Sequence, residues 1–303
     1  MSMDQVEAGV CAHRDVVSGP RDVIRMVSWN IARGCQFDQV TEFLFDSKAD
    51  LIILQEADRD SRRTSYRNIA KEISQKLGMN YVFGIEFQEL GQGSSQCPAF
   101  HGQATLSPWP MSRSSILRFQ RQSKFWRPYW GIPRLAVLQR RLGGRMALRT
   151  HVTIANRTIA VYNLHLESRR EDDLRCAQLI ELLQDARHHN SNLPVIAAGD
   201  FNFDLTQPAP ASAIATARFS NPFAGTRIPT TRPARLGRSK AVDWVLIKGI
   251  LRPAAPQVHS SVTASDHYPL SLQLQLPQLA EASEQAVSAP DNCRCPDLVD
   301  CRP

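Results

Sequence analysis

The sequence of 303 residues contains no long uninterrupted apolar run. A membrane-spanning helix needs roughly 18–20 such residues, so the sequence excludes a transmembrane helix. The first 22 residues also lack the apolar stretch of a secretion signal and carry charged side chains instead: Asp4, Glu7, Arg14, Asp15, Arg21 and Asp22. We therefore expect a soluble protein that is not secreted and resides in the cytoplasm.

Cysteine is scarce as well. The seven cysteines are irregularly spaced, and an odd number leaves one unpaired, which argues against a disulfide framework. Three of them, Cys293, Cys295 and Cys301, lie near the end of the chain without a fourth metal ligand close by. We expect residues 278–303 to form a disordered polar tail, and metal binding by its three thiols is the alternative.

Acidic residues are absent from residues 112–145, although the whole chain has a formal charge of only +7. This basic segment contains Arg113, Arg118, Arg121, Lys124, Arg127, Arg134, Arg140, Arg141 and Arg145, interleaved with Phe119, Phe125, Trp126, Tyr129 and Trp130. Such a composition is typical of a groove for nucleic acid, where aromatic rings stack on bases and cations follow phosphates. It also suits an anionic lipid surface. The third interpretation is a solvated insertion whose aromatic residues pack back onto the domain.

Short apolar runs rich in β-branched residues recur along the chain and predict strands. They are 23–29, 51–54, 81–87, 147–154, 158–166, 194–198, 242–247 and 269–276. Helical periodicity predicts helices over 40–47, 69–77 and 171–189. The last begins with acidic residues and ends with basic ones, which suits the helix dipole. Strands and helices mixed over the whole length indicate a layered α/β fold with mixed sheets.

The predicted domain organisation is simple. One catalytic domain spans residues 23–277 and carries the basic insertion at 112–145. Residues 1–22 form an N-terminal tail, and the proline-rich stretch 203–241 is a long irregular connection.

Polar residues suited to metal or phosphate chemistry stand at or near the ends of the predicted strands. They are Asn30, Glu56, His165, Asp200, Asn202, Asp243, Asp266 and His267. Taken singly, a carboxylate or asparagine at a strand end is usually a turn former or a helix cap, and a lone histidine is usually a core residue. Together they indicate a site, because sites in α/β folds assemble at strand ends.

The segments around these residues resemble the endonuclease/exonuclease/phosphatase family. They are Ser28-Trp29-Asn30, Leu54-Gln55-Glu56, Asn163-Leu164-His165-Leu166, Gly199-Asp200-Phe201-Asn202, Val242-Asp243-Trp244 and Ser265-Asp266-His267. The resemblance covers residues 23–276 in order. It implies a four-layer α/β sandwich, with two packed mixed β-sheets flanked by helices, and the hydrolysis of phosphoester bonds. His165 resembles the branch of nucleases, lipid phosphodiesterases and inositol-phosphate phosphatases more than the abasic-site repair branch.

One segment departs from the family pattern. Where the family commonly has Gly-Asn before Ile-Leu-Ser-Arg, this chain has His101-Gly102-Gln103-Ala104-Thr105-Leu106-Ser107-Pro108. Gln103 stands in place of the asparagine, and the arginine is missing. A phosphate contact from that arginine is therefore not expected here.

The candidate residues divide into a metal site and an acid–base site. Glu56 and Asp266, with Asn30, are expected to hold Mg²⁺ or Mn²⁺, which prefer oxygen ligands. Asp200 is expected to orient or deprotonate the attacking water, and Asn202 to donate a hydrogen bond to a phosphate oxygen. Asp243 is expected to fix the tautomer of His267. Which of His165, Asp200 and His267 acts as acid or base stays open.

Three functions follow for an anionic phosphoester substrate. The first is a metal-dependent phosphodiesterase or nuclease, and the second is a phosphatase acting on a small-molecule or lipid-borne phosphate. The third, a catalytically silent binding domain, is the least favoured, because every acidic and histidine position of the motif set is filled.

Overall fold

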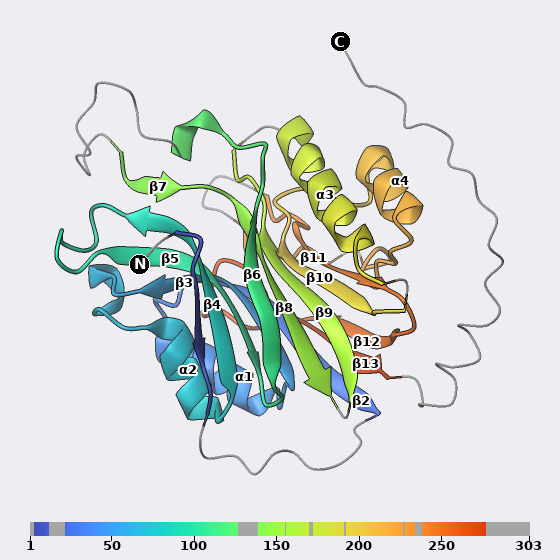
Figure 1. Ribbon diagram of the computed structural model, residues 1–303, viewed down its shortest axis with the longest axis horizontal. Helices are drawn as coiled ribbons and strands as arrows, with labels where there is room; N and C mark the ends of the chain where they lie inside the picture. The colour runs from blue at the N-terminus through green and yellow to red at the C-terminus, as the bar shows by residue number, and fades with distance from the viewer. Residues whose placement is uncertain are drawn as a thin grey trace.

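The computed structural model (Figure 1) describes residues 3–11, 22–126, 139–154, 156–169, 172–190, 192–226, 228–233 and 238–276. The predicted C-terminal tail with Cys293, Cys295 and Cys301 lies outside these residues, as do residues 127–138 of the basic segment. None of the helices in the described ranges has the length and apolar character needed to cross a membrane.

An eight-stranded sheet forms one half of the fold. Its strands are β1 (Val6–Gly9), β2 (Val23–Arg33), β3 (Leu51–Arg59), β4 (Asn80–Glu89), β5 (Ala99–Ser107), β7 (Arg141–Gly143), β12 (Arg252–Val258) and β13 (Leu270–Gln275). They run in the order β1-β4-β5-β3-β2-β13-β12, and β7 also pairs with β4. Strands β2 and β3 are parallel, whereas the other pairs are antiparallel, so this sheet is mixed.

A five-stranded sheet forms the other half. Its strands are β6 (Met111–Arg118), β8 (Met146–Ile154), β9 (Arg157–His165), β10 (Val195–Asp200) and β11 (Asp243–Lys248), in the order β11-β10-β9-β8-β6. Only β9 and β10 are parallel among these described pairs, so this sheet is mixed too.

Helices lie on the outer faces of both sheets (Figure 1). Helices α1 (Phe37–Asp46) and α2 (Ile69–Leu77) lie beside the eight-stranded sheet, and α3 (Asp172–Arg187) and α4 (Pro208–Thr216) cover the other. Short 3-10 turns occur at Arg62–Thr64 and Lys124–Trp126. This arrangement confirms the predicted four-layer sandwich.

Strand β3 shows how alternation along a strand builds the layers. Leu51 and Ile53 face the second sheet and belong to the core cluster that continues under α3 and α4. Ile52 and Leu54 point the other way and pack with residues of α1 and α2. Because successive side chains in a strand point to opposite faces, one short apolar run supplies two cores.

The buried Asn163 of β9 joins the two sheets. Its side-chain amide nitrogen donates to the carbonyl oxygens of Leu54 and Ala104, each at 2.9 Å, and its side-chain oxygen accepts from Nε2 of Gln55 at 2.8 Å. Leu54 and Gln55 lie on β3 and Ala104 on β5, so one side chain is hydrogen-bonded to two strands of the facing sheet. These directional bonds fix how one sheet sits on the other, which apolar contacts alone do less strictly.

The predicted segment boundaries need three corrections. Residues 1–22 are not a tail throughout, because Val6–Gly9 pair with β4 as strand β1. The stretch 203–241 is not irregular throughout, because its prolines at 208 and 210 fall in the first turn of α4, where proline is tolerated. The basic segment is not a separate insertion at its ends, because it begins within β6 and Arg145 is buried in the core.

Strand β12 forms one edge of the eight-stranded sheet. Its sequence, RPAAPQV, contains Pro253 and Pro256, and its register with β13 shifts between Ala254 and Gln257. Proline is confined to edge strands and bulges because it has no amide hydrogen to donate.

We expect Asn163→Ala to lower the free energy of unfolding by about 2–5 kcal/mol, because it leaves the Leu54 and Ala104 carbonyl groups and the Gln55 amide buried without partners. Urea unfolding followed by circular dichroism measures the change. Asn192→Ala, at an exposed asparagine, is the matched control and should change stability by less than about 0.5 kcal/mol. Equal stability of the two variants would show that Asn163 does not join the sheets energetically.

Candidate active site

Glu56 enters the site at a β-bulge. The pairing of β3 with β5 shifts between Leu54 and Ala57, so that two residues of β3 lie opposite one residue of β5. Glu56 adopts a left-handed backbone with φ of 55°. A bulge turns a side chain away from the direction that a regular strand would give it. Left-handed conformations of residues other than glycine cost of order 1–3 kcal/mol and are common at functional sites.

The Glu56 carboxylate has few partners of its own. Its side chain is only 17% exposed, and its one ion pair within the described ranges is with Arg33, at 3.9 Å. Burial alone would raise the pKa of Glu56, but electrostatic interactions with His101, His165 and Arg33 outweigh burial and hold that pKa well below its usual range. An ionised carboxylate that receives no hydrogen bond from a described residue suits a bound cation.

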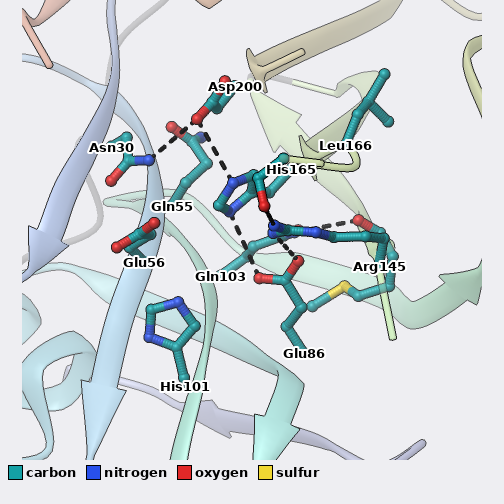
Figure 2. Close-up of polar contacts among 12 residues, drawn as sticks. Asn30, Gln55, Glu56, Glu86, His101, Gln103, Arg145, His165, Leu166 and Asp200 are labelled. Carbon is teal, nitrogen blue, oxygen red and sulfur yellow. Dashed lines mark hydrogen bonds and ion pairs between the residues drawn. The ribbon is translucent and has the colours of Figure 1, made fainter. Parts of the chain in front are cut away.

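Asp200 contacts several residues of the site, and Figure 2 shows it joined to Asn30 and His165. Its Oδ2 accepts a hydrogen bond from Nδ2 of Asn30 at 3.2 Å and lies 3.5 Å from Nε2 of His165 and 3.7 Å from Nε2 of His267. Asn30 comes from the eight-stranded sheet and His165 from the five-stranded one, so the site lies where the two sheets meet. Gly199, the residue before Asp200, has a φ of 146°. A Cβ atom on Gly199 would lie 2.0 Å from the Leu164 carbonyl oxygen.

His267 forms the predicted pair with Asp243. Nδ1 of His267 lies 2.8 Å from Oδ2 of Asp243, which also accepts from the Thr230 hydroxyl at 2.6 Å. Asp243 lies opposite Asp200 in the pairing of β11 with β10. Burial lowers the pKa of His267, but the charges of Asp243 and Asp200 outweigh burial and raise that pKa to about 10. His267 is therefore a hydrogen-bond donor at neutral pH.

His165 lies between two carboxylates. Its Nε2 is 3.5 Å from Asp200, and its Nδ1 is 3.5 Å from Oε2 of Glu86. Glu86 is completely buried, and its Oε1 accepts a hydrogen bond from Arg145 at 2.7 Å. Burial raises the pKa of Glu86, but Arg145 and His165 lower it further, to about 2. Glu86 is thus an anion aimed at His165.

Sequence reasoning missed Glu86 and Arg145. The signal for Glu86 was an acidic residue inside the predicted strand 81–87, of the same kind as the residues that were chosen. Glu86 also lies at a bulge, because the pairing of β4 with β5 shifts between Ile85 and Phe87. Arg145 was counted only as one cation of the basic segment, although its guanidinium is buried and also donates to the Ser168 hydroxyl at 2.7 Å.

The remaining predicted residues lie at the margin of the site. Nδ2 of Asn202 donates to the Leu166 carbonyl oxygen at 3.1 Å, which leaves its second amide hydrogen for a ligand. Asp266 is exposed, and its Oδ1 lies 3.3 Å from the Ser265 hydroxyl. Gln103, in place of the family asparagine, does not reach into the site: it donates to the Met146 carbonyl and accepts from the Leu148 amide.

Trp126 does not fit the predicted role in stacking on bases. Its ring is buried, it packs on Phe87 at a centroid distance of 4.7 Å, and its indole nitrogen donates to Glu167 at 2.8 Å. This residue follows the third interpretation, in which aromatic side chains of the segment pack back onto the domain. Phe125, by contrast, is 43% exposed and lies under the guanidinium of Arg169, 3.5 Å from the ring centre.

A second set of side chains could also hold a metal ion. Atoms of Asp200, Asp243 and His267 all lie within 4.8 Å of one another. His267 and Asp243 already satisfy each other through the 2.8 Å hydrogen bond, however. Glu56 has no such partner and is the better candidate for the primary cation ligand.

The fold and this site define a class of protein: a four-layer α/β sandwich with carboxylates and histidines gathered where the two sheets meet. Residues 27–267 match the model of the Endonuclease/Exonuclease/phosphatase family. The chain belongs to this family, whose members hydrolyse phosphoester bonds. No significant match was found among curated proteins.

Solved structures share the fold. The human Nocturnin catalytic domain, solved with a bound sulfate anion, superposes with a TM-score of 0.64 at 17% identity, covering 91% of this chain and 98% of that chain. A family protein from Beutenbergia cavernae gives 0.61 at 17% identity, covering 84% and 72%. Truncated Caenorhabditis elegans TDP2 gives 0.55 at 17% identity, covering 84% and 97%. At this identity, the likeness establishes the fold alone.

We expect Asp243→Asn to lower the pKa of His267 by at least about one unit, because it removes the anion that raises this pKa most. NMR titration of protein with labelled histidine rings measures the shift. The ring of His259, which contacts the Ser271 hydroxyl instead, should titrate alike in both proteins. An unchanged His267 titration would contradict the pairing.

Proposed function

We propose that the chain is a divalent-cation-dependent phosphodiesterase or nuclease. The observation that carries this proposal is the pair of histidines, His165 and His267, on either side of Asp200 Oδ2. Each imidazole has a carboxylate of its own, Glu86 and Asp243 respectively. Cleavage of a diester needs one group to accept a proton from water and another to donate one to the leaving oxygen. Two separately oriented imidazoles beside a carboxylate supply both.

The roles follow from the contacts. The Asp200 carboxylate orients the attacking water and accepts its proton. His267, kept protonated by its raised pKa, donates from Nε2 to a phosphate oxygen, and Asp243 holds the ring in that orientation. His165 donates a proton to the leaving oxygen, with Glu86 beside Nδ1. Asn202 donates its second amide hydrogen to phosphate.

Glu56, with Asn30 and Asp266, would hold the cation. When bound, Mg²⁺ or Mn²⁺ supplies a Lewis acid that neutralises charge on the phosphoryl group. The Glu56 carboxylate supports this assignment, because its one described ion pair, with Arg33, is long at 3.9 Å and it receives no hydrogen bond from a described residue. The sulfate anion in the catalytic domain of human Nocturnin supports a binding site for tetrahedral oxyanions in this fold.

A cleft beside the site supports a substrate with a large group attached to the phosphate. It has a volume of about 740 Å³, and its lining includes Ser168, Arg175, Asn202, Gln207, Lys240 and His267. This size suits a group as large as a nucleotide or lipid head group.

The basic segment is a weaker support for nucleic acid or anionic lipid. Arg118, Arg141 and Arg145 are held by internal partners. Arg121 and Lys124 are exposed, next to Phe125, and Arg113 and Arg140 are exposed as well. A polyanion contact therefore depends on these four cations among the described residues of that stretch.

We expect the wild type to hydrolyse at least one phosphodiester in Mg²⁺ or Mn²⁺, and Glu56→Ala to lose cation binding and at least about a thousandfold in activity, because the cation loses its primary carboxylate. Plasmid DNA, RNA, phospholipid and inositol phosphates are compared, with binding measured by calorimetry. Glu42→Ala, at an exposed site on α1, is the control and should match wild type.

The outcomes separate the candidates. Turnover of inositol phosphates alone would favour the phosphatase, and no turnover with intact cation binding would favour the silent domain. Full activity of Glu56→Ala at ordinary Mg²⁺ would remove the metal assignment.

We expect the double variant Arg121→Ala/Lys124→Ala to bind a polyanion more weakly and with a flatter salt dependence, because fewer counterions are released. For single-stranded DNA, two lost phosphate contacts lower the slope of log K against log salt by about 1.4. Binding is measured across a salt series with DNA, RNA and anionic vesicles, with Lys48→Ala, at an exposed turn residue after α1, as control. Equal slopes for all proteins would leave the segment without a binding role.

A further inference from the structure

His101 is a buried histidine of β5 that the proposed reaction does not use. Its side chain is fully buried, and it lies directly opposite Asp58 in the pairing of β3 with β5. Its Nδ1 lies 2.9 Å from Oδ1 of Asp58. Arg63 donates two hydrogen bonds to the same carboxylate, at 2.7 and 2.8 Å. Arg63 thus holds this carboxylate in place, and it also pairs with Glu89 at 3.1 Å.

These contacts fix the tautomer of the ring. A carboxylate accepts hydrogen bonds and cannot donate one, so Nδ1 of His101 carries the proton that points at Asp58. In the neutral tautomer with Nδ1 as the donor, Nε2 presents a lone pair.

The Nε2 atom is buried and has no hydrogen-bond partner among the described residues. Leaving a buried polar atom without a partner costs about 1–3 kcal/mol, so such an atom calls for an explanation. Figure 2 shows the His101 ring directed at the carboxylate of Glu56. The unpartnered nitrogen and the carboxylate of Glu56 thus face each other.

We propose that Nε2 of His101 is a ligand of the same cation that Glu56 binds. The proposal rests on the metal site of the proposed function and extends it. A metal-bound histidine almost always donates its other ring nitrogen to a carboxylate or carbonyl group, which is the arrangement of His101 with Asp58. The bound cation supplies the positive charge beside Glu56 that a second proton on the ring would otherwise supply.

A nitrogen ligand changes which ion the site prefers. Mg²⁺ is held almost exclusively by oxygen ligands. Imidazole binds Mn²⁺ better than it binds Mg²⁺, although it binds the later transition metals better still. The site is therefore expected to bind Mn²⁺ more tightly than Mg²⁺. An all-oxygen site of Glu56, Asn30 and Asp266 gives a smaller preference.

Pulsed electron paramagnetic resonance of bound Mn²⁺ tests the proposal, because it detects a directly coordinated nitrogen nucleus. We expect a coordinated nitrogen-14 signal in wild type and its loss in His101→Asn. The asparagine amide reproduces the donor to Asp58 but has no atom in the place of Nε2. Calorimetry should find Mn²⁺ binding about tenfold weaker in this variant and Mg²⁺ binding changed by less than about threefold.

Two further variants keep the result interpretable. His101→Gln puts an amide group near the place of Nε2, and it should lose the nitrogen signal if the oxygen faces the cation. His267→Asn leaves His101 intact and should keep the signal. Thermal unfolding in the absence of added metal checks that each variant folds, and one of the two His101 variants suffices if the other does not.

Several outcomes would overturn the proposal. The first is a wild-type spectrum without coordinated nitrogen, and the second is a nitrogen signal that survives in folded His101→Asn. The third is a nitrogen signal that disappears in His267→Asn alone, which would assign the ion to Asp200, Asp243 and His267. Glu56→Ala distinguishes this failure from that of the proposed function. If Glu56→Ala abolishes Mn²⁺ binding while His101→Asn leaves the spectrum unchanged, only the nitrogen ligand is wrong.

Discussion

The hydrogen bonds of Asn163 across the two sheets are the interaction on which the site depends. Apolar side chains fill the space between sheets but allow small sliding movements, whereas three buried hydrogen bonds from one side chain do not. Asn163 is two residues from His165, and Leu54 is two residues from Glu56. These bonds therefore hold the middle of β3 against the end of β9. This relation lets Asp200 meet Asn30 from one sheet and His165 from the other.

Two bulges then direct carboxylates into the site that regular strands would not direct there. Strand β5 is flanked by β3 and β4, and the pairing shifts on both sides close to His101 and Gly102. Glu56 lies at the shift between β3 and β5, and Glu86 lies at the shift between β4 and β5. A bulge disrupts the ladder locally, so the surrounding sheet must be stable enough to tolerate it. The completely buried β5, held on both sides, provides that stability.

Much of the fold followed from the sequence because its signals are local. The predicted strands and the helices at 40–47, 69–77 and 171–189 correspond to observed elements, and the four-layer sandwich is confirmed. Strand β5 was missed because it is buried on both faces yet carries His101, Gln103 and Thr105, so it shows neither alternation nor a continuous apolar run. Strand β12 was missed for the opposite reason, since nearly all of it is exposed.

The candidate site was predictable where a residue stands at a strand end, and less so inside a strand. Asn30, His165, Asp200, Asp243 and His267 do gather at one place, although their chemical roles stay predictions. Glu86 and Arg145 are hydrogen-bonded to each other although about sixty residues of sequence separate them, and no local sequence pattern predicts such a pair. His101 appeared only as a departure from the family motif, and its unpartnered nitrogen needs three-dimensional contacts to be recognised.

The prolines of β12 bear on how the protein behaves at high concentration. An exposed edge strand is a template on which another chain can add a strand, and this is a common route to aggregation. Two of the seven residues of β12 have no amide hydrogen to offer an incoming strand, and its irregular register bends the edge. The open edge of the larger sheet is thereby protected from edge-to-edge assembly, and no helix in the described ranges is needed to cover it.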